Sequence, residues 1–162
     1  MSDHVAFGVE QWRALRPEFD LTGMEVFGRV YRLARLADLR RTAFLEPYGL
    51  QTGDVDVLAT LFRYEGQLRP VELRQAMMIG SGTLTARLDR LEAAGLLQRH
   101  PDPEDRRGRL IRLTAEGQRL TPEVIAGLLD LENELLAAVP ARARTRLAAD
   151  LRRLLAGIED VD

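Results

Sequence analysis

The sequence predicts a mainly α-helical chain that is interrupted once by a short β-ribbon. Apolar residues recur at three- and four-residue steps through most of the chain, which is the spacing of amphipathic helices. Between residues 96 and 113 this spacing gives way to two short strand-like runs around a segment rich in proline and charge. Glycine and proline stand where the helical spacing stops, so the 162 residues divide into helices joined by tight turns.

Four helices are expected before the ribbon, and residues typical of helix ends mark their limits. Thr22 with Glu25 three residues later is a capping-box signature at the start of the first helix, which Pro47 and Gly49 end. Ser81 is expected to cap the fourth helix, and a glycine follows the end of that helix. The predicted helices cover about residues 22–46, 52–65, 71–78 and 81–94.

The ribbon is expected from residues 96–100 and 110–113, because the prolines between them forbid a helix and Gly108 suits the tip of a hairpin. Thr114 stands at the start of a long helix that Pro140 interrupts, and one further helix follows. The first helix and these last two carry more apolar surface than a small core covers. Such surfaces usually mark an interface, so these helices are expected to pair with a second copy of the chain.

The order of helix, turn, short helix, turn, helix and basic hairpin is that of a winged helix-turn-helix, a DNA-binding fold. Leu84, Leu88 and Leu91 share one face of the fourth helix and are expected to pack in the core. The other face carries small polar residues and an arginine, which suit a helix that enters the major groove, roughly 12 Å wide. The candidate DNA-reading residues are Ser81, Thr83, Thr85, Ala86 and Arg90.

The net charge of −2 means that any DNA affinity must come from a local basic patch, and the hairpin supplies one. Arg106, Arg107, Arg109 and Arg112 fall within seven residues of one another. An arginine at a ribbon tip suits the minor groove, where the negative potential is strongest, and Asp105 is expected to orient Arg107. Taken singly, the leucine stripe is ordinary core packing and an arginine-rich hairpin is an ordinary solvated turn. Their order and spacing together favour DNA binding.

Two motifs resemble those of the MarR family of transcriptional regulators. The run from Leu88 to Arg99 is similar to the family's RLExxGLxxR passage, and the run from Asp105 to Thr114 matches its DxRxxxxxLT wing signature. The resemblance implies a repressor that binds a pseudo-palindromic operator in double-stranded DNA as a homodimer. The expected parts are an N-terminal dimerisation part at residues 1–46, a winged helix-turn-helix at 47–113, and C-terminal dimerisation helices at 114–162.

One subgroup of this family responds to urate, and the chain resembles that subgroup at four positions. These are Trp12 in an N-terminal extension, Asp56 in the second helix, Arg87 in the fourth helix and Arg99 after it. The resemblance implies that Trp12 covers a planar anion such as urate or a phenolic acid, that the arginines bind it, and that Asp56 balances their charge in the empty pocket. Three ordinary roles stay open: a phosphate contact for Arg87, an ion pair between Asp56 and Arg99, and a hydrophobic anchor for Trp12.

Composition argues against several other classes of protein. The chain has no cysteine and only two histidines, His4 and His100, so disulfides, thiol chemistry and a metal site are not expected. No Gly-rich phosphate loop or promising nucleophile–base pair is present, so we expect neither an enzyme nor a cofactor. No apolar run reaches the roughly 20 residues that span a bilayer, and we expect a cytoplasmic protein. The remaining alternatives are a DNA-binding regulator that needs no ligand and a winged helix that contacts only protein.

Overall fold

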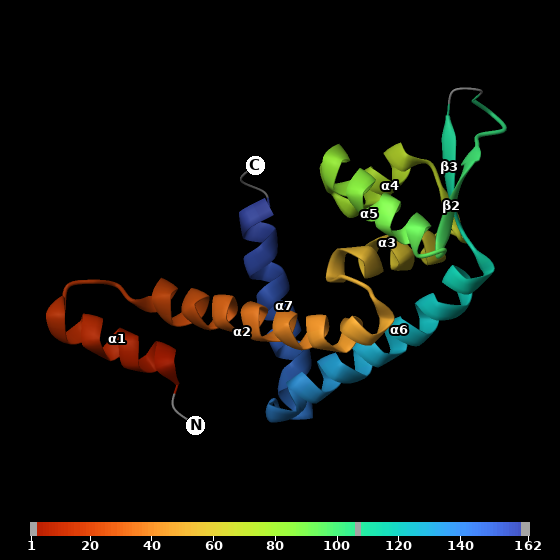
Figure 1. Ribbon diagram of the computed structural model, residues 1–162. Coiled ribbons are helices and arrows are strands. Elements are labelled where there is room, and N and C mark those ends of the chain that lie inside the picture. The colour runs from red at the N-terminus through yellow and green to blue at the C-terminus, as the bar shows by residue number, and fades with distance from the viewer. Residues whose placement is uncertain (1–2, 106–107, 160–162) are drawn as a thin grey trace. The chain divides into compact units, whose positions relative to one another are not determined.

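The computed structural model describes residues 3–105 and 108–159, and within these ranges the chain is mainly helical (Figure 1). The helices are α1 His4–Leu15, α2 Thr22–Leu45, α3 Thr52–Arg63, α4 Pro70–Met77, α5 Ser81–Ala93, α6 Ala115–Leu135 and α7 Ala141–Glu159. Short 3-10 turns, Glu46–Tyr48 and Leu136–Ala138, follow α2 and α6. The strands are β1 Gln67–Leu68, β2 Leu97–Pro101 and β3 Arg109–Leu113. The predicted mainly α fold with a β-ribbon is confirmed.

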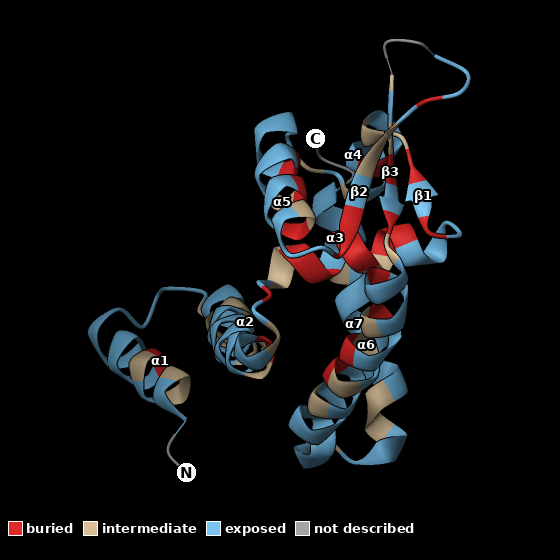
Figure 2. Ribbon diagram, turned by 45° about the vertical axis from the view of Figure 1, so that its right-hand side comes forward, coloured by how far each residue is buried: buried red, intermediate tan, exposed pale blue. Residues whose placement is uncertain are grey.

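Burial is concentrated in α3, α5 and the sheet, and it is sparse in the terminal helices (Figure 2). Leu84, Leu88 and Leu91 of α5 are buried, as their spacing predicted. Among the described residues of α1, Val9 alone is buried, and no described residue of α7 is buried. The hydrophobic core therefore belongs to the helix-turn-helix and its sheet.

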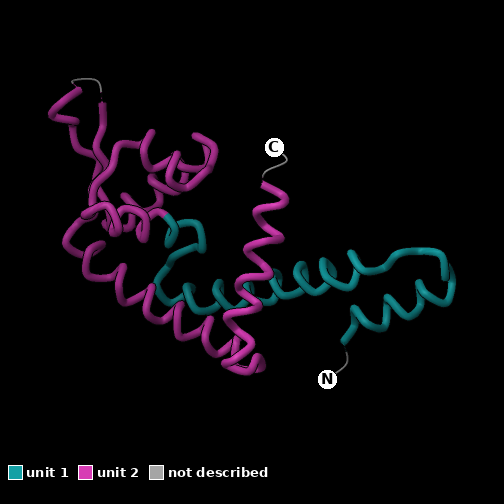
Figure 3. The backbone as a smooth tube through the Cα atoms, turned by 180° about the vertical axis from the view of Figure 1, so that it is seen from behind, with its two compact units in different colours: residues 1–56 teal, residues 57–162 magenta. Residues whose placement is uncertain are grey.

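The chain divides into two compact units, residues 1–56 and 57–162 (Figure 3). The first unit contains α1, α2 and the start of α3. The second contains the rest of α3, the sheet and the helices from α4 onward. The helix-turn-helix pair and the sheet beside it therefore belong to one unit.

In the first unit α1 packs along α2, and an ion pair joins the two helices. Asp3 caps α1, because one carboxylate oxygen accepts hydrogen bonds from first-turn amides at 3.0 and 3.3 Å. Its other oxygen accepts from Arg29 of α2, at 2.5 Å from Nη2 and 3.1 Å from Nε. The helices approach closely at Gly28, where a Cβ would lie 2.9 Å from Val5 Cγ1. The N-terminal extension is therefore a helix that packs on α2.

The capping box predicted at the start of α2 is wrong, although the helix does begin at Thr22. Leu21 is the N-cap residue, and its own side chain makes no capping hydrogen bond. The Thr22 amide instead donates to Asp20 Oδ1 at 3.0 Å. Glu25 does not return to the cap, because its carboxylate pairs with Arg13 of α1 at 3.0 Å. Because α1 packs on α2, Glu25 pairs with Arg13 instead of bonding to the helix start, which is the contact that the local pattern had predicted.

The sheet contains one strand that the sequence pattern did not predict. β1 pairs antiparallel with β3, so the strand order is β1-β3-β2 and β3 is central. Gly66, at φ 82°, turns the chain from α3 into β1, and its carbonyl accepts a hydrogen bond from the Leu113 amide at 2.8 Å. β2 and β3 form the predicted ribbon, with Arg99 opposite Ile111. A strand as short as β1 shows no alternation of apolar and polar residues, so only its pairing reveals it.

Thr114 ends the ribbon and is the N-cap of α6, so the helix begins where the sequence predicted. Its hydroxyl accepts a hydrogen bond from the Gly117 amide at 3.0 Å and donates to the Gly95 carbonyl at 2.7 Å. One hydroxyl therefore joins the start of α6 to the turn that follows α5. Gly117 lies against the backbone at the same junction, because a Cβ there would come within 2.0 Å of the Leu96 carbonyl oxygen.

We expect Gly117→Ala to destabilise the chain, because the new Cβ would collide with backbone rather than with a flexible side chain. Overpacking of this kind costs about 1–3 kcal/mol in the free energy of unfolding. Gly23→Ala is the control, since a Cβ at position 23 meets nothing within 4 Å. Urea unfolding of both variants measures the difference. A Gly117→Ala variant as stable as the unmodified protein would contradict the close approach to residue 96.

Candidate nucleic-acid interface

Helix α5 presents an exposed polar face opposite its buried leucines. Its N-cap is Gly80, at φ −69° and ψ 154°, and Ser81 is the first helical residue. The prediction that Ser81 caps this helix is therefore wrong, since Ser81 lies inside the helix and the N-cap glycine makes no side-chain capping bond. Small side chains keep one side of the helix narrow, as entry into the major groove requires. The predicted DNA-reading residues are all exposed: Ser81, Thr83, Thr85, Ala86 and Arg90.

The wing carries exposed arginines on β3. Arg109 opens this strand and Arg112 lies near its end, and both are exposed. Arg106 and Arg107 lie outside the described residues, and so does the predicted contact between Asp105 and Arg107. Those three wing assignments stay predictions.

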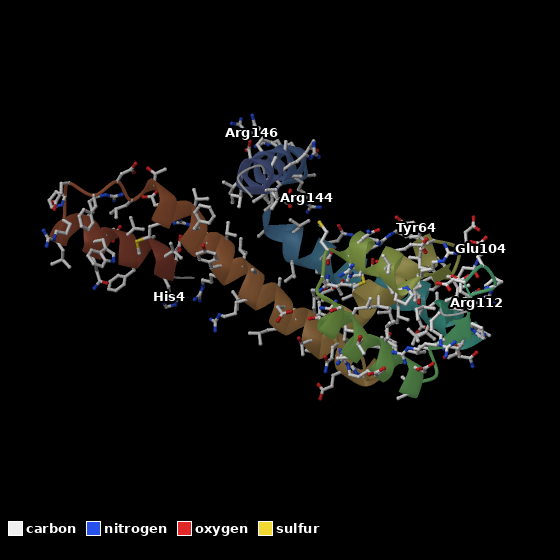
Figure 4. All side chains as sticks on the ribbon, turned by 90° about the horizontal axis from the view of Figure 1, so that it is seen from above. His4, Tyr64, Glu104, Arg112, Arg144 and Arg146 are labelled. Atoms are coloured by element: carbon white, nitrogen blue, oxygen red, sulfur yellow. The ribbon has the colours of Figure 1, made fainter. Side chains whose placement is uncertain are left out.

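An ion-pair cluster holds the base of the wing against the start of α4. Asp102, whose side chain is 1% exposed, accepts a hydrogen bond from Arg69 Nε at 2.5 Å, and Glu104 accepts one from Arg69 Nη2 at 2.5 Å. Glu104 and Arg112 line one pocket of about 250 Å³ beside these residues, and both are labelled in Figure 4. Arg69, which directly precedes α4, is therefore joined by its side chain to the loop that follows β2.

The cluster shifts the pKa values of both partners in the direction that favours their charged forms. Hydrogen bonds from Arg69 and from the Glu104 amide lower the pKa of the Asp102 carboxyl. Hydrogen bonds to Asp102 and then to Glu104 raise the pKa of the Arg69 guanidinium. Because the carboxyl pKa is lowered in the folded state, the stabilisation is present above the ordinary aspartate pKa and is lost as the pH falls through the lowered value.

A second arginine ties β2 to helix α5. Arg99 Nη2 lies 2.6 Å from Asp89 Oδ1, Nη1 pairs with Glu92, and the Arg99 amide donates to Glu92 Oε1 at 3.1 Å. Partial burial lowers the pKa of the Arg99 guanidinium, but hydrogen bonds to the two carboxylates outweigh it and raise the pKa overall. Arg99, which the sequence assigns to a ligand pocket, thus holds two residues of α5.

Sequence reasoning missed the cluster around Arg69, although position 69 carried a signal. The residue stands at the N-cap of α4, directly before Pro70. Ser, Thr, Asp and Asn are preferred at an N-cap because their oxygen atoms accept hydrogen bonds from helix amides. A guanidinium has no acceptor, so an arginine there indicates a partner elsewhere in the fold. The sequence alone does not say that the partner is Asp102, which is 33 residues further along the chain.

The four predicted ligand residues lie on four different elements. Trp12 of α1 is 45% exposed and stacks on Phe19, with ring centroids 6.1 Å apart. Asp56 is exposed on α3, whereas Arg87 on α5 and Arg99 on β2 are half-buried. Their meeting in one pocket stays a prediction.

Residues 3–105 and 108–159 contain neither a candidate metal site nor a helix that could cross a membrane. In these ranges no group of three or more His, Cys, Asp or Glu side chains could hold a metal ion. No helix in the same ranges is both long enough and apolar enough to cross a membrane.

A helix-turn-helix whose second helix exposes small polar residues, next to a ribbon with exposed arginines, is the geometry of a winged helix-turn-helix DNA-binding protein. A family model described as MarR family matches residues 48–108. The HTH-type transcriptional regulator PecS of Dickeya dadantii is 38% identical over 148 residues, which cover 90% of this chain and 89% of that protein. The multiple antibiotic resistance protein MarR of Escherichia coli is 29% identical over 140 residues, covering 81% of this chain and 96% of that protein. The chain belongs to the MarR family.

Solved structures agree with this assignment. A variant of MarR from E. coli complexed with operator DNA has a TM-score of 0.71 and 29% identity, and the match covers 85% of this chain and 99% of that chain. AbsC, a MarR family transcriptional regulator from Streptomyces coelicolor, has a TM-score of 0.74 at 23% identity, covering 88% and 99%, and shows the fold alone. The chain is a DNA-binding transcriptional regulator with a MarR-like winged helix-turn-helix fold. Because its family consists of transcriptional regulators, the prediction that it is not an enzyme is also confirmed.

Proposed function

We propose that the chain is a repressor that binds a pseudo-palindromic operator as a homodimer and leaves it when a small planar anion binds. The observation that carries this proposal is the contact of Arg99 with Asp89 and Glu92 of α5. A residue assigned to the ligand pocket thereby positions the helix assigned to DNA reading. An anion that competes for Arg99 changes the contacts that hold this helix.

In this proposal the exposed face of α5 contacts base edges in the major groove, and the wing enters the neighbouring minor groove. The amides in the first turn of α5 have no side-chain cap, which leaves them available to a phosphate group. A MarR variant of similar fold is known in complex with operator DNA, which supports this mode of binding. The proposed contacts of α5 are Ser81, Thr83, Thr85, Ala86 and Arg90, and those of the wing are Arg106, Arg107 and Arg109.

We expect Arg109→Ala to weaken operator binding by about 1–3 kcal/mol and to lower the salt dependence by about one unit of slope, because one phosphate-neutralising charge is lost. Fluorescence anisotropy on the intergenic DNA upstream of the gene, at several salt concentrations, measures both. The control is Arg119→Ala, which removes an exposed arginine that pairs with Glu116 and Glu123 on α6. Equal losses for the two variants would contradict a specific wing contact.

The proposed dimer interface uses the parts at residues 1–46 and 114–162. α7 carries an apolar stripe at helical spacing that is largely exposed, with exposed fractions between 39% and 55% at Leu147, Leu151, Leu155 and Ile158. The stripe is the kind of apolar surface that a two-fold partner covers in a homodimer. The winged helix-turn-helix at residues 47–113 is then free to face DNA.

We expect the protein to be a dimer in solution without DNA, and Leu151→Asp to shift it toward monomer, because a charge would be buried in the interface. Ala156→Asp is the matched control, since it places the same charge on the opposite side of the same helix. Light scattering at micromolar concentration measures the mass. A monomer mass for the unmodified protein, or equal behaviour of both variants, would contradict the proposed interface.

The proposed effector is a planar anion such as urate or a phenolic acid. Its ring would lie under Trp12, its negative charge would pair with Arg87 and Arg99, and Asp56 would balance those charges before the ligand arrives. Arg99 is half-buried and already makes paired hydrogen bonds with carboxylates, which shows the chemistry that it would offer an anion. Competition for Arg99 weakens the support that β2 gives to α5.

We expect urate, xanthine or a simple phenolic acid to bind and to weaken operator affinity by about 1–3 kcal/mol, with DNA weakening ligand affinity by the same factor. Trp12→Ala should lower ligand affinity through lost stacking while leaving operator affinity nearly unchanged, and Phe19→Ala tests the ring that stacks on Trp12. Calorimetric titration with and without operator measures both affinities. Operator binding that none of the three compounds weakens would favour a regulator without such a ligand.

A further inference from the structure

Arg69 occupies a position where an arginine side chain cannot cap its own helix. It is the N-cap residue of α4, and its amide donates to Glu72 Oε2 at 2.8 Å. The guanidinium is a donor only, so it cannot take hydrogen bonds from the first-turn amides. Its side chain instead reaches the loop that leaves β2.

The partner of Arg69 is a buried carboxylate at the root of the wing. The Asp102 side chain is 1% exposed and takes hydrogen bonds from Arg69 Nε at 2.5 Å and from the Glu104 amide at 2.9 Å. The Asp102 amide donates to the Gly108 carbonyl at 3.2 Å, so the same residue also closes the base of the hairpin loop. A substitution at Asp102 therefore alters contacts at both ends of that loop, with Arg69 and with Gly108.

We propose that Arg69 is a positioning residue that sets the orientation of the wing relative to the helix-turn-helix, so that wing and α5 engage the operator together. The inference rests on the proposed contact between wing and DNA. Without Arg69 the buried Asp102 carboxylate keeps no cationic partner among the contacts described above, and a buried unpaired charge is costly. The loop then moves to bring that carboxylate to water, and the wing loses its fit to the groove.

Direct contact of Arg69 with a phosphate is a poorer explanation of its role. The guanidinium lies within 4 Å of three carboxylates, those of Asp102, Glu104 and Glu72. One positive charge against three negative ones makes a cluster that repels phosphate rather than neutralising it. The two explanations also predict different results when the negative partner is removed.

The test is a double-mutant cycle on operator affinity with Arg69→Ala and Arg109→Ala. In the unmodified protein we expect Arg109→Ala to lower operator affinity about 5- to 150-fold. In the Arg69→Ala background, where the wing no longer fits, we expect the same change to cost less than about threefold. If Arg69 and Arg109 contacted phosphates independently, their fold-losses in affinity would multiply. Equal losses for Arg109→Ala in both backgrounds would therefore overturn the inference while leaving the wing contact standing.

Asp102→Asn provides the second measurement. The change removes a negative charge with almost no change of shape, so electrostatics alone would raise operator affinity. Positioning by Arg69 predicts a lower affinity, and it predicts that Asp102→Asn and Arg69→Ala together cost no more than either alone. A higher affinity for Asp102→Asn would overturn the inference. This nearly isosteric variant also carries the test if Arg69→Ala fails to fold, which thermal unfolding shows.

Two controls separate this role from general loss of charge or of structure. Arg119→Ala removes an arginine of a similar exposed cluster on α6 and should leave the cost of Arg109→Ala unchanged. Arg69→Lys keeps the charge but not the forked geometry, so it should not restore operator affinity, whereas a phosphate contact would largely tolerate lysine. Full rescue by lysine would overturn the inference. If Arg109→Ala has no effect in the unmodified protein, the proposed wing contact itself is wrong and the inference falls with it.

Discussion

The structure depends on the burial of one stripe of leucines on α5. Leu84, Leu88 and Leu91 are each at most 3% exposed, and burying such a side chain contributes about 1.5–3 kcal/mol. Because residues three and four apart share a face of a helix, burial of this stripe turns the opposite face to solvent. The orientation of the exposed polar face, which carries the proposed DNA-reading residues, is thus a consequence of core packing. No polar contact within α5 is needed to set it.

The position of the wing beside this helix depends on charged side chains as well as on packing. Arg99 joins β2 to Asp89 and Glu92 of α5, and Arg69 joins the start of α4 to Asp102 below the hairpin. Each helix of the helix-turn-helix is therefore linked to the wing by a guanidinium. Ion pairs at a surface add little to stability, but a forked, multiply bonded arginine fixes geometry. These arginines therefore fix the position of the wing relative to α4 and α5.

The terminal helices differ from α5 in burial. They carry apolar side chains, but few of these side chains are buried within the chain. α7 is amphipathic, yet no described residue in it is buried. α1 contacts α2 through the Asp3–Arg29 and Arg13–Glu25 pairs and approaches it closely at Gly28, and Val9 is its one buried residue among those described. Helices of this kind gain most of their stability from packing against other helices. The winged helix-turn-helix and the proposed dimerisation parts are therefore stabilised by different means within one chain.

The order of the helices from α2 onward, the leucine stripe and the family motifs were readable from the sequence, because helical spacing and turn residues are local properties. Thr114 was predicted to stand at the start of α6 and is its N-cap, through a hydrogen bond that spans only three residues. Local patterns failed where a distant residue competes for the same side chain, as Arg13 does for Glu25 at the start of α2. They also failed for β1, whose two residues are a strand only because β3 lies beside them.

By itself, the sequence determined which small polar residues and arginines are available for the proposed contacts with DNA, and that the chain has no thiol. The tertiary structure decided which charges meet: Arg69 with Asp102 across 33 residues, and Arg99 with the two carboxylates of α5. The physical reason is that ion pairs have no sequence period. Their partners are chosen by the turns and strand pairing that bring distant segments within about 4 Å, where the attraction between opposite charges becomes significant.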